Sequence, residues 1–357
     1  MNSATTPIAP AVPTAVLTPV PTPIPTAVLT ATPSDHGGPD ASGPARWDFS
    51  TNANAAGPCP PALQTVQAAD PTRYPDPGYH ALREHLAGWH GVDPARIVLA
   101  ASGSEFIQRI TAVSQGLRAG PVALPRHAYG DYARAALAQG RTCVAEDDTA
   151  ATLRWCCDPG SPLGQHAPMP SDLSRIPTVL DAVYAPLRLQ GQGAWTAGGR
   201  DEVFVLHSPN KALGLTGVRA AYAVAPLGAR WQPWLDALAQ AAPSWAVGAH
   251  GVALLEAWPS VPVQQWLASS LKLLGAWRHS QTELLAGLGV AVQPSSTPFF
   301  CAQLGMAATA LRRHGVQVRD AASFGLPGWA RLNTLPPEAQ GALATALGVP
   351  NAGSMPR

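Results

Sequence analysis

The sequence predicts an α/β fold, in which a large unit holds a mostly parallel sheet covered by helices and a smaller α+β unit follows it. Short apolar, β-branched runs alternate along the chain with segments whose apolar residues recur at helical spacing. Strands that alternate with helices pair in parallel, because each crossover helix returns the chain to the same edge of the sheet. A chain of 357 residues with 46% hydrophobic content is long enough for both units.

The elements follow in order from residue 79. Helical spacing of apolar residues predicts helices over 79–89, 105–115, 130–139 and 261–288. Apolar runs predict the seven strands of the sheet, at 97–100, 121–124, 142–145, 153–157, 178–180, 203–206 and 220–224. The strands and helices after Val290 are expected to form the small unit.

The N-terminal stretch differs from the rest of the chain. Residues 13–18 and 25–30 repeat Pro-Thr-Ala-Val-Leu-Thr, and prolines recur throughout the stretch. Each proline removes a helix donor, which argues against a membrane span, and no basic segment precedes the repeats, which argues against a secretory signal. We therefore expect a disordered Pro/Thr-rich tail.

The expected domain organisation has four parts. Residues 1–35 form the tail, 36–60 an N-terminal arm of the small domain, 61–260 the large domain, and 261–357 an interdomain helix with the small C-terminal domain. The composition does not suggest an electrostatic nucleic-acid partner, because the net charge is +1 and only 13% of the residues are charged. Five cysteines without zinc spacing are expected to be thiols in a reducing cytoplasm, and no metal site is expected.

Lys211 is the most informative residue of the sequence. It follows the predicted strand 203–206 in the segment Ser208-Pro-Asn-Lys211, and Arg219 comes eight residues later. Such a lysine can form a Schiff base with the aldehyde of pyridoxal phosphate (PLP), while the serine hydroxyl and the guanidinium hold the cofactor phosphate. Taken alone, the pattern is more often a surface lysine in a glycine-rich turn, so a second element is needed.

Asp181 and Tyr184 supply that second element. Asp181 ends an apolar run, where its carboxylate can pair with the protonated pyridine nitrogen of PLP and keep the ring an electron sink. Tyr184 can donate its hydroxyl to the phenolate oxygen of the ring. An isolated Asp at a strand end is more often a helix cap or loop residue. The combination Asp-x-x-Tyr before Ser-x-x-Lys-x7-Arg is much harder to obtain by chance.

These elements resemble the fold-type I PLP enzymes, the aspartate aminotransferase superfamily. Similar segments occur in the superfamily's order from about His36 to Leu347, at 48–54, 73–77, 102–105, 125–132, 158–164 and 318–332. Segments 73–77 and 318–332 are most similar to those of histidinol-phosphate aminotransferases and threonine-phosphate decarboxylases. The resemblance begins only at His36, which is consistent with a translation start later than Met1.

The resemblance implies a PLP-binding role for each matching residue. The implied cofactor contacts are Gly103, Ser104, Glu105, Tyr129, Ser161, Asp181, Tyr184, Ser208, Lys211 and Arg219. Lys211, Asp181 and Tyr184 are the implied catalytic residues, with Lys211 the nearest general acid and base. Tyr129 would stack on the cofactor ring, although ordinary core packing explains an aromatic there equally well. Ser161 stands where relatives carry an Asn that hydrogen-bonds the phenolate oxygen of PLP; a serine can also donate, but its side chain is shorter.

The resemblance also implies the substrate contacts and the partner. Asn54 and Arg331 would bind the substrate, with Arg331 on its carboxylate, and Arg319 would meet a second anion. The alternative for Arg319 is a solvated side chain beside Asp320. Tyr74 would reach the cofactor phosphate of a neighbouring subunit, which implies a homodimer with shared active sites.

The reaction is not settled by these residues, because the same set serves transamination and decarboxylation. Likeness at 36–38, 245–247 and 318–324 favours an L-threonine-O-3-phosphate decarboxylase of cobalamin biosynthesis over a histidinol-phosphate-type aminotransferase. A non-catalytic PLP-binding protein is the alternative from another class. The joint presence of Lys211, Asp181, Tyr184 and Arg219 argues against it.

Overall fold

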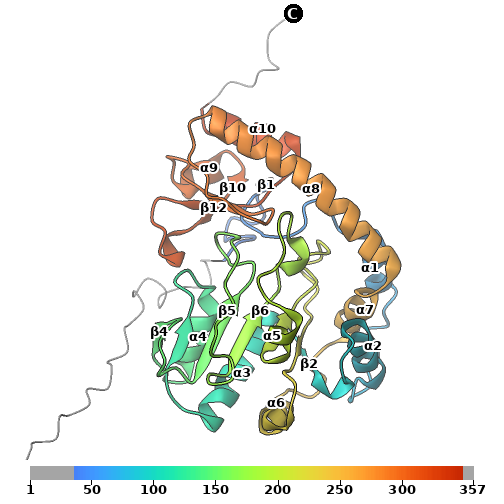
Figure 1. Ribbon diagram of the computed structural model, residues 1–357. Coiled ribbons are helices and arrows are strands. Elements are labelled where there is room, and N and C mark those ends of the chain that lie inside the picture. The colour runs from blue at the N-terminus through green and yellow to red at the C-terminus, as the bar shows by residue number, and fades with distance from the viewer. Residues whose placement is uncertain (1–35, 349–357) are drawn as a thin grey trace, which may run out of the picture.

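The structure is a computed structural model that describes residues 36–348, so the tail predicted over residues 1–35 lies outside the described residues. A large sheet with its helices occupies the lower half of the view in Figure 1, and a smaller sheet lies above it. This is the predicted α/β fold with a small α+β unit. The predicted domain boundaries remain a prediction.

The large sheet has seven strands, as the sequence predicts. Their spatial order is β2 (Ile97–Ala100), β8 (Ala221–Val224), β7 (Phe204–His207), β6 (Thr178–Asp181), β5 (Leu153–Cys157), β3 (Val122–Leu124) and β4 (Cys143–Ala145). Strand β8 is antiparallel to both of its neighbours, and the other neighbouring strands pair in parallel. The strands are apolar along nearly their whole length because helices cover both faces of the sheet.

Two sets of helices cover the two faces. One face packs against α3 (Gly103–Leu117), α4 (Gly130–Ala138) and α6 (Gln232–Gln240). The other packs against α1 (Pro60–Gln67), α2 (His80–His90) and α7 (Ala249–Ala257). Shorter helices are α5 (Ala197–Asp201), η3 (Pro94–Arg96), η4 (Ala185–Leu187) and η5 (Ala229–Trp231). Helices α1, α6 and α7 were not predicted. Helix α7 is apolar around most of its circumference, so its helical period is weak, whereas α1 and α6 have an apolar face from which they could have been predicted.

The small unit contains two sheets and two helices. Strands β11 (Arg319–Asp320), β12 (Ala330–Leu332) and β9 (Phe300–Ala302) form an antiparallel sheet. Strand β1 (Trp47–Asp48) pairs in parallel with β10 (Val316–Gln317), so the N-terminal arm joins this unit. Helices α9 (Ala308–Arg313) and α10 (Pro337–Ala346) and the turn η6 (Ala322–Phe324) complete the unit.

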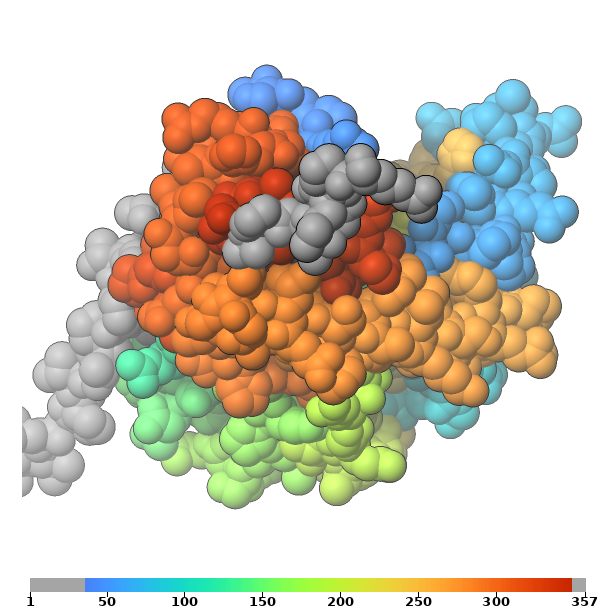
Figure 2. Space-filling view, turned by 90° about the horizontal axis from the view of Figure 1, so that it is seen from above, coloured from blue at the N-terminus to red at the C-terminus, as the bar shows by residue number. Residues whose placement is uncertain are grey.

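Helix α8 (Val261–Gly287) joins the two units. Its 27 residues correspond to a length of about 40 Å, and Figure 2 shows it as an orange band across one face of the molecule. Leu267 and Leu274 belong to the core of the large unit, whereas Leu285 belongs to the core of the small unit. None of the described helices has the length and apolarity needed to cross a membrane. All five cysteines are buried, and none of them forms a disulfide bond.

Gln281 provides a test of how α8 holds the small unit. Its buried amide donates from Nε2 to the Asn333 carbonyl at 3.0 Å and accepts at Oε1 from the Leu335 N–H at 3.1 Å. We expect Gln281→Leu to lower the free energy of unfolding by about 2–4 kcal/mol, because two backbone groups lose their partner. Urea denaturation measures this change.

The matched control is Gln265→Leu, which changes an exposed glutamine of the same helix. We expect this variant to stay within about 0.5 kcal/mol of the parent. Equal losses in the two variants would show that helix propensity, and not the buried amide, accounts for the effect.

Candidate active site

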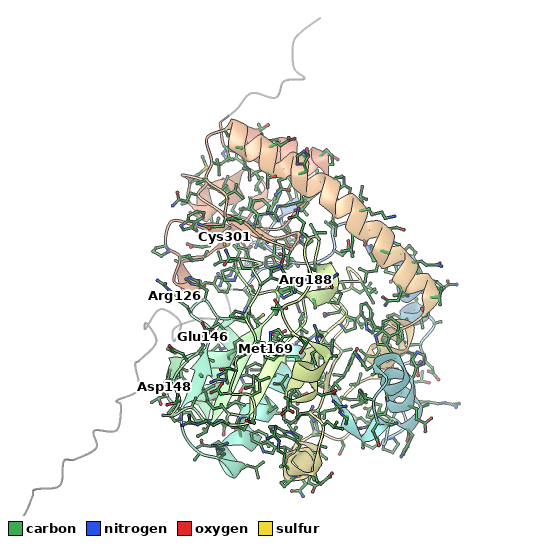
Figure 3. All side chains as sticks on the ribbon, in the orientation of Figure 1. Arg126, Glu146, Asp148, Met169, Arg188 and Cys301 are labelled. Atoms are coloured by element: carbon green, nitrogen blue, oxygen red, sulfur yellow. The ribbon has the colours of Figure 1, made fainter. Side chains whose placement is uncertain are left out.

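Most of the residues that the sequence singles out meet in one cavity of about 640 Å³. The cavity lies where the carboxyl ends of the large sheet's parallel strands face the small sheet. Figure 3 shows the side chains between the two units, with Cys301 on the small-unit side and Arg126 and Glu146 on the large-unit side. The predicted residues that line the cavity are Gly103, Ser104, Tyr129, Ser161, Asp181, Tyr184, Ser208, Lys211, Arg219, Arg319 and Arg331.

Lys211 lies half-buried in this cavity, just after β7. Burial lowers the pKa of its amine, the charge of Asp181 raises it, and the guanidinium charges of Arg219 and Arg331 lower it again. A lowered pKa increases the fraction of neutral, nucleophilic amine near neutral pH. The chain contains two lysines, and the other one, Lys272, is exposed on α8. Lys211 is therefore the lysine amine placed for chemistry.

Asp181 is a buried carboxylate held by two donors at the end of β6. The Tyr132 hydroxyl donates to its Oδ2 at 2.6 Å, and the Val183 N–H donates to its Oδ1 at 3.0 Å. Burial raises the pKa of Asp181, whereas these hydrogen bonds and the Lys211 charge lower it. Tyr132 is fixed by stacking on Trp155, with ring centroids 4.4 Å apart. The donors therefore favour the charged form of a carboxyl group that burial alone would neutralise.

Tyr132 was not predicted as a site residue. It belongs to the segment 125–132, and it lies three residues after Tyr129, which is the N-cap of α4. Residues three apart at the start of a helix lie on neighbouring positions of one face, so this spacing could have indicated that both tyrosines reach the same cavity. Both residues do line it.

The N-terminus of α3 forms another wall. Gly103 and Ser104 line the cavity there, and Ser104 Oγ lies 3.4 Å from the Tyr129 hydroxyl oxygen. Free N–H groups at a helix N-terminus favour bound anions. Glu105, in contrast, does not line the cavity. Its N–H donates to the Ser102 side chain at 3.1 Å, and its carboxylate pairs with Arg109 Nε at 2.9 Å.

Arg319 and Arg331 stand directly opposite each other on two neighbouring antiparallel strands of the small sheet, β11 and β12. Both are buried, at 8% and 7% exposure. Arg331 donates from Nη2 to the Ser50 carbonyl at 2.7 Å and from Nη1 to Ser161 Oγ at 3.4 Å. Arg319 donates from Nη2 to Ser323 Oγ at 2.7 Å. Two desolvated guanidiniums on one wall make this end of the cavity strongly anion-attracting.

Phe324 lies between these two arginines. The guanidinium carbon of Arg319 is 5.1 Å from its ring centroid, and that of Arg331 is 5.7 Å away. Both distances suit a cation–π contact. The ring therefore helps to support two like charges that stand opposite each other.

Asn54 and Tyr74 do not reach the cavity. Asn54 is buried and donates from Nδ2 to the Ala212 carbonyl at 3.0 Å and to Ser270 Oγ at 2.7 Å, so it braces the loop that carries Lys211. Tyr74 is 76% exposed and stacks on Trp245, with ring centroids 4.3 Å apart.

Asn52 lines the cavity instead of Asn54. Its Nδ2 donates to the Tyr184 hydroxyl at 3.4 Å.

Ser208, another cavity residue, already has acceptors for its hydroxyl, because Asn210 Oδ1 and the Ala220 carbonyl oxygen each lie 3.0 Å away. Ser208 must therefore exchange one of these acceptors to bind a ligand anion.

The segment from His36 to Pro39 also lines the cavity, although the sequence marked it only as a point of resemblance. The Gly38 N–H donates to Ser50 Oγ at 2.9 Å. A Cβ at Gly37 would lie 2.1 Å from the Ser50 carbonyl oxygen, so only glycine fits this close approach. The N-terminal arm is thereby held against the wall that contains Arg331.

Residues 159–347 match the family model described as aminotransferase class I and II. The histidinol-phosphate aminotransferase of Rhodospirillum centenum is 29% identical, with 84% of this chain and 90% of that protein covered. The histidinol-phosphate aminotransferase of Granulibacter bethesdensis is 30% identical, with 80% of this chain and 84% of that protein covered.

Solved structures share the fold at lower identity. Histidinol-phosphate aminotransferase from Sinorhizobium meliloti, in complex with pyridoxal-5'-phosphate, has a TM-score of 0.69 at 22% identity, with 83% of this chain and 88% of that chain covered. L-threonine-O-3-phosphate decarboxylase from Porphyromonas gingivalis also has a TM-score of 0.69, at 21% identity, with 84% of this chain and 97% of that chain covered. The chain belongs to the class I and II aminotransferase family of PLP-dependent enzymes.

The cavity fits pyridoxal phosphate. Its volume of about 640 Å³ lies in the range of small-molecule sites. Among the described residues, Asn52 Oδ1 and Arg331 Nε are buried without a hydrogen-bond partner, and both belong to residues that line the cavity. Such orphaned polar groups are expected where a polar ligand completes the site. The positive charges and the helix N-terminus suit the cofactor phosphate.

Tyr132→Phe tests the support of Asp181. The lost hydroxyl lowers the pKa of Asp181 in the parent, so its removal raises that pKa. If the charged carboxylate holds the cofactor ring, the decrease in PLP affinity on the acidic side moves to higher pH in this variant. Measuring the PLP dissociation constant from pH 5 to pH 9 by visible absorbance checks this expectation.

Tyr79→Phe is the control, because the buried Tyr79 hydroxyl donates to the Val247 carbonyl at 2.8 Å, outside the cavity lining. Its decrease in PLP affinity on the acidic side should coincide with that of the parent. A decrease that also coincides in Tyr132→Phe would mean that the hydroxyl does not tune Asp181.

Proposed function

We propose that this chain is a PLP-dependent enzyme acting on a phosphorylated amino acid, with L-threonine-O-3-phosphate decarboxylation as its reaction. The observation that carries the proposal is the pair of buried guanidiniums, Arg319 and Arg331, on one wall of the cavity that contains Lys211. An amino acid with both a carboxylate and a phosphate gives each guanidinium an anion.

The proposed cofactor site uses the residues that line the cavity. Lys211 holds the cofactor aldehyde, Asp181 the pyridine nitrogen, and Tyr184 with Ser161 the phenolate oxygen. The residues that would hold the phosphate, at the N-terminus of α3 and beside it, are Gly103, Ser104, Ser208 and Arg219. Tyr129 supplies an aromatic face for the ring. When bound, PLP supplies an electron sink for negative charge that develops at the substrate α-carbon.

In the proposed substrate site, Arg331 binds the carboxylate and Arg319 binds the phosphate. A plain aliphatic amino acid leaves one desolvated guanidinium without its anion, which costs a few kcal/mol. When the carboxylate leaves as carbon dioxide, the protonated Lys211 amine would deliver the proton that replaces it at the α-carbon. Its lowered pKa, caused first by burial, suits an acid and base that works near neutral pH.

A histidinol-phosphate-type aminotransferase is the second candidate. It is favoured by the sequence relatives, which carry that name at 29% and 30% identity over most of this chain. Histidinol phosphate carries a phosphate without a carboxylate, whereas 2-oxoglutarate carries two carboxylates. In this alternative, Arg319 and Arg331 bind the two substrates in turn.

We also propose that two copies of the chain share their active sites. Tyr74 is 76% exposed and stacks on Trp245, which is itself 40% exposed. Two adjacent exposed aromatic rings outside the cavity suit a partner surface. In a homodimer, the Tyr74 hydroxyl would serve the cofactor phosphate of the partner subunit.

The first expected outcome concerns the two lysines. Reduction with borohydride in the presence of PLP should label Lys211 in the parent protein, and peptide mapping identifies the labelled residue. Lys211→Ala should lose the label and at least about three orders of magnitude of turnover. Lys272→Ala, which changes the exposed lysine of α8, should retain both. Labelling at Lys272 would overturn the assignment.

The second expected outcome concerns substrate charge. O-phospho-L-threonine should be preferred over alanine or leucine by roughly two or more orders of magnitude in kcat/KM. Arg319→Ala should weaken phosphorylated substrates much more than unphosphorylated ones, whereas Arg313→Ala, at an exposed position of α9, should change neither.

A two-part assay identifies the reaction. Carbon dioxide release from O-phospho-L-threonine supports the decarboxylase, and glutamate formation from histidinol phosphate and 2-oxoglutarate supports the aminotransferase. Turnover of unphosphorylated amino acids alone would refute the two-anion pocket.

A further inference from the structure

The segment that carries Arg319 and Phe324 takes its shape from local hydrogen bonds. The Ala322 N–H donates to Asp320 Oδ1 at 2.8 Å, and the Phe324 N–H donates to the Ala321 carbonyl at 3.0 Å. These two bonds fix the shape of the turn η6 and the way it follows β11. They do not determine where the turn lies against the large sheet.

His127 supplies a contact from the large unit. It lies in the loop between β3 and α4, and its Nδ1 is 2.7 Å from the Phe324 carbonyl oxygen. A carbonyl only accepts, so His127 donates from Nδ1. Gly325 follows in the left-handed region, at φ +77°, where glycine is favoured. This turn therefore exposes the Phe324 carbonyl to the histidine ring.

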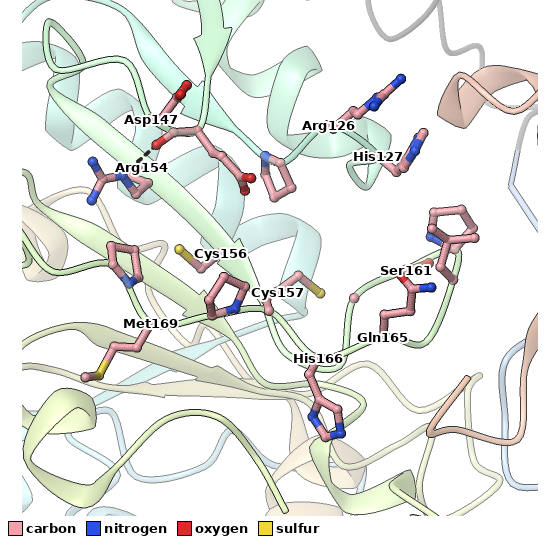
Figure 4. Close-up of a pocket in the computed structure, with 18 of the residues that line it drawn as sticks. Arg126, His127, Asp147, Arg154, Cys156, Cys157, Ser161, Gln165, His166 and Met169 are labelled. Atoms are coloured by element: carbon pink, nitrogen blue, oxygen red, sulfur yellow. Dashed lines mark hydrogen bonds between the residues drawn. The ribbon is translucent and has the colours of Figure 1, made fainter. Parts of the chain in front are cut away.

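The two residues joined by this hydrogen bond line two neighbouring cavities. His127 lines a second cavity of about 500 Å³, which shares Cys157 and Ser161 with the candidate active site, whereas Phe324 lines the active-site cavity. Figure 4 shows His127 beside Arg126, with Ser161 and Gln165 toward the same end of the second cavity. The histidine thus reaches the substrate wall from outside the active site.

Phe324 is the residue through which this contact acts. Its ring supports both guanidiniums, and it packs in a cluster with Leu163 of the large unit. The apolar packing of Leu163 against this cluster has no preferred direction, whereas the hydrogen bond from His127 fixes both distance and orientation. Displacing the Phe324 backbone would move the ring away from Arg319 and Arg331 together.

We infer that His127 is a positioning residue, whose hydrogen bond to Phe324 holds the segment 319–325 so that Arg319 and Arg331 face the substrate together. The identity of the substrate rests on the proposed function, but the hydrogen bond and its effect on the segment do not. The role belongs to binding: His127 does not line the active-site cavity and moves no proton there.

The test compares His127→Asn with His127→Gln. The Asn amide can place a donor near the position of Nδ1, whereas the longer Gln amide reaches the position of Nε2. A matched control is His314→Leu, which changes an exposed histidine after α9. All variants are prepared as full chains loaded with PLP.

The first measurement is amide hydrogen exchange of residues 319–326, recorded without substrate. Loss of a hydrogen bond should speed exchange in this segment about fivefold in His127→Gln, and not in His127→Asn or His314→Leu. Equal exchange in all variants would overturn the inference. Because no substrate is present, this outcome is independent of whether the proposed reaction is correct.

The second measurement separates KM from kcat on the phosphorylated substrate that the panel identifies. His127→Gln should raise KM about fivefold with little change in kcat, and His127→Asn should restore the parent value. Faster exchange with an unchanged KM would overturn the role in substrate binding. If His127→Gln does not fold, His127→Leu replaces it, with the same expected exchange and KM.

Discussion

The parallel pairing of β6 and β7 is the constraint on which the rest of the site depends. It brings the carboxyl ends of both strands to one edge, so Asp181 at the end of β6 and Lys211 after β7 enter the same cavity. A buried carboxylate and a half-buried charged amine each cost free energy when they lack a partner. Tyr132 and Val183 lower the cost for Asp181, and the Tyr132 ring is itself fixed by Trp155. The packing of the Tyr132 ring in the core therefore also stabilises the charge of Asp181 in the site.

The small unit contributes positively charged side chains to this site. Helix α8 anchors in both cores, and β1 brings the N-terminal arm beside β10, so the small sheet and the arm reach the cavity together. Arg331 then links three separate segments, because it donates to Ser50 and Ser161 from its own strand. A substrate anion would meet a guanidinium whose orientation is already fixed, which reduces the entropy lost on binding.

Strand positions and the residues at or near strand ends could be predicted because they depend on local pattern. Apolar runs predict β2 to β8, Asp181 ends one such run, and Lys211 follows another after a short loop. Contacts that depend on side-chain direction could not. Asn54 was predicted to bind substrate, yet Asn52 lines the cavity. The Ala53 N–H donates to the Thr51 carbonyl, so a tight turn at this point separates the directions of the two asparagines. The role proposed for Tyr74 involves a second chain, whose position one sequence does not give.

Arg319 and Arg331 are held in an arrangement that other residues must stabilise. Like charges directly opposite each other in an antiparallel pair repel. Phe324 offsets part of this repulsion, since each cation–π contact contributes about 0.5–2 kcal/mol. That contribution falls quickly if the ring moves, because each guanidinium must remain within about 6 Å of the ring centroid. In the proposed function, a substrate with two anions would offset the remaining repulsion, and a substrate with one anion would do so only in part. Discrimination by charge would then depend on the backbone that holds the Phe324 ring as well as on the two arginines.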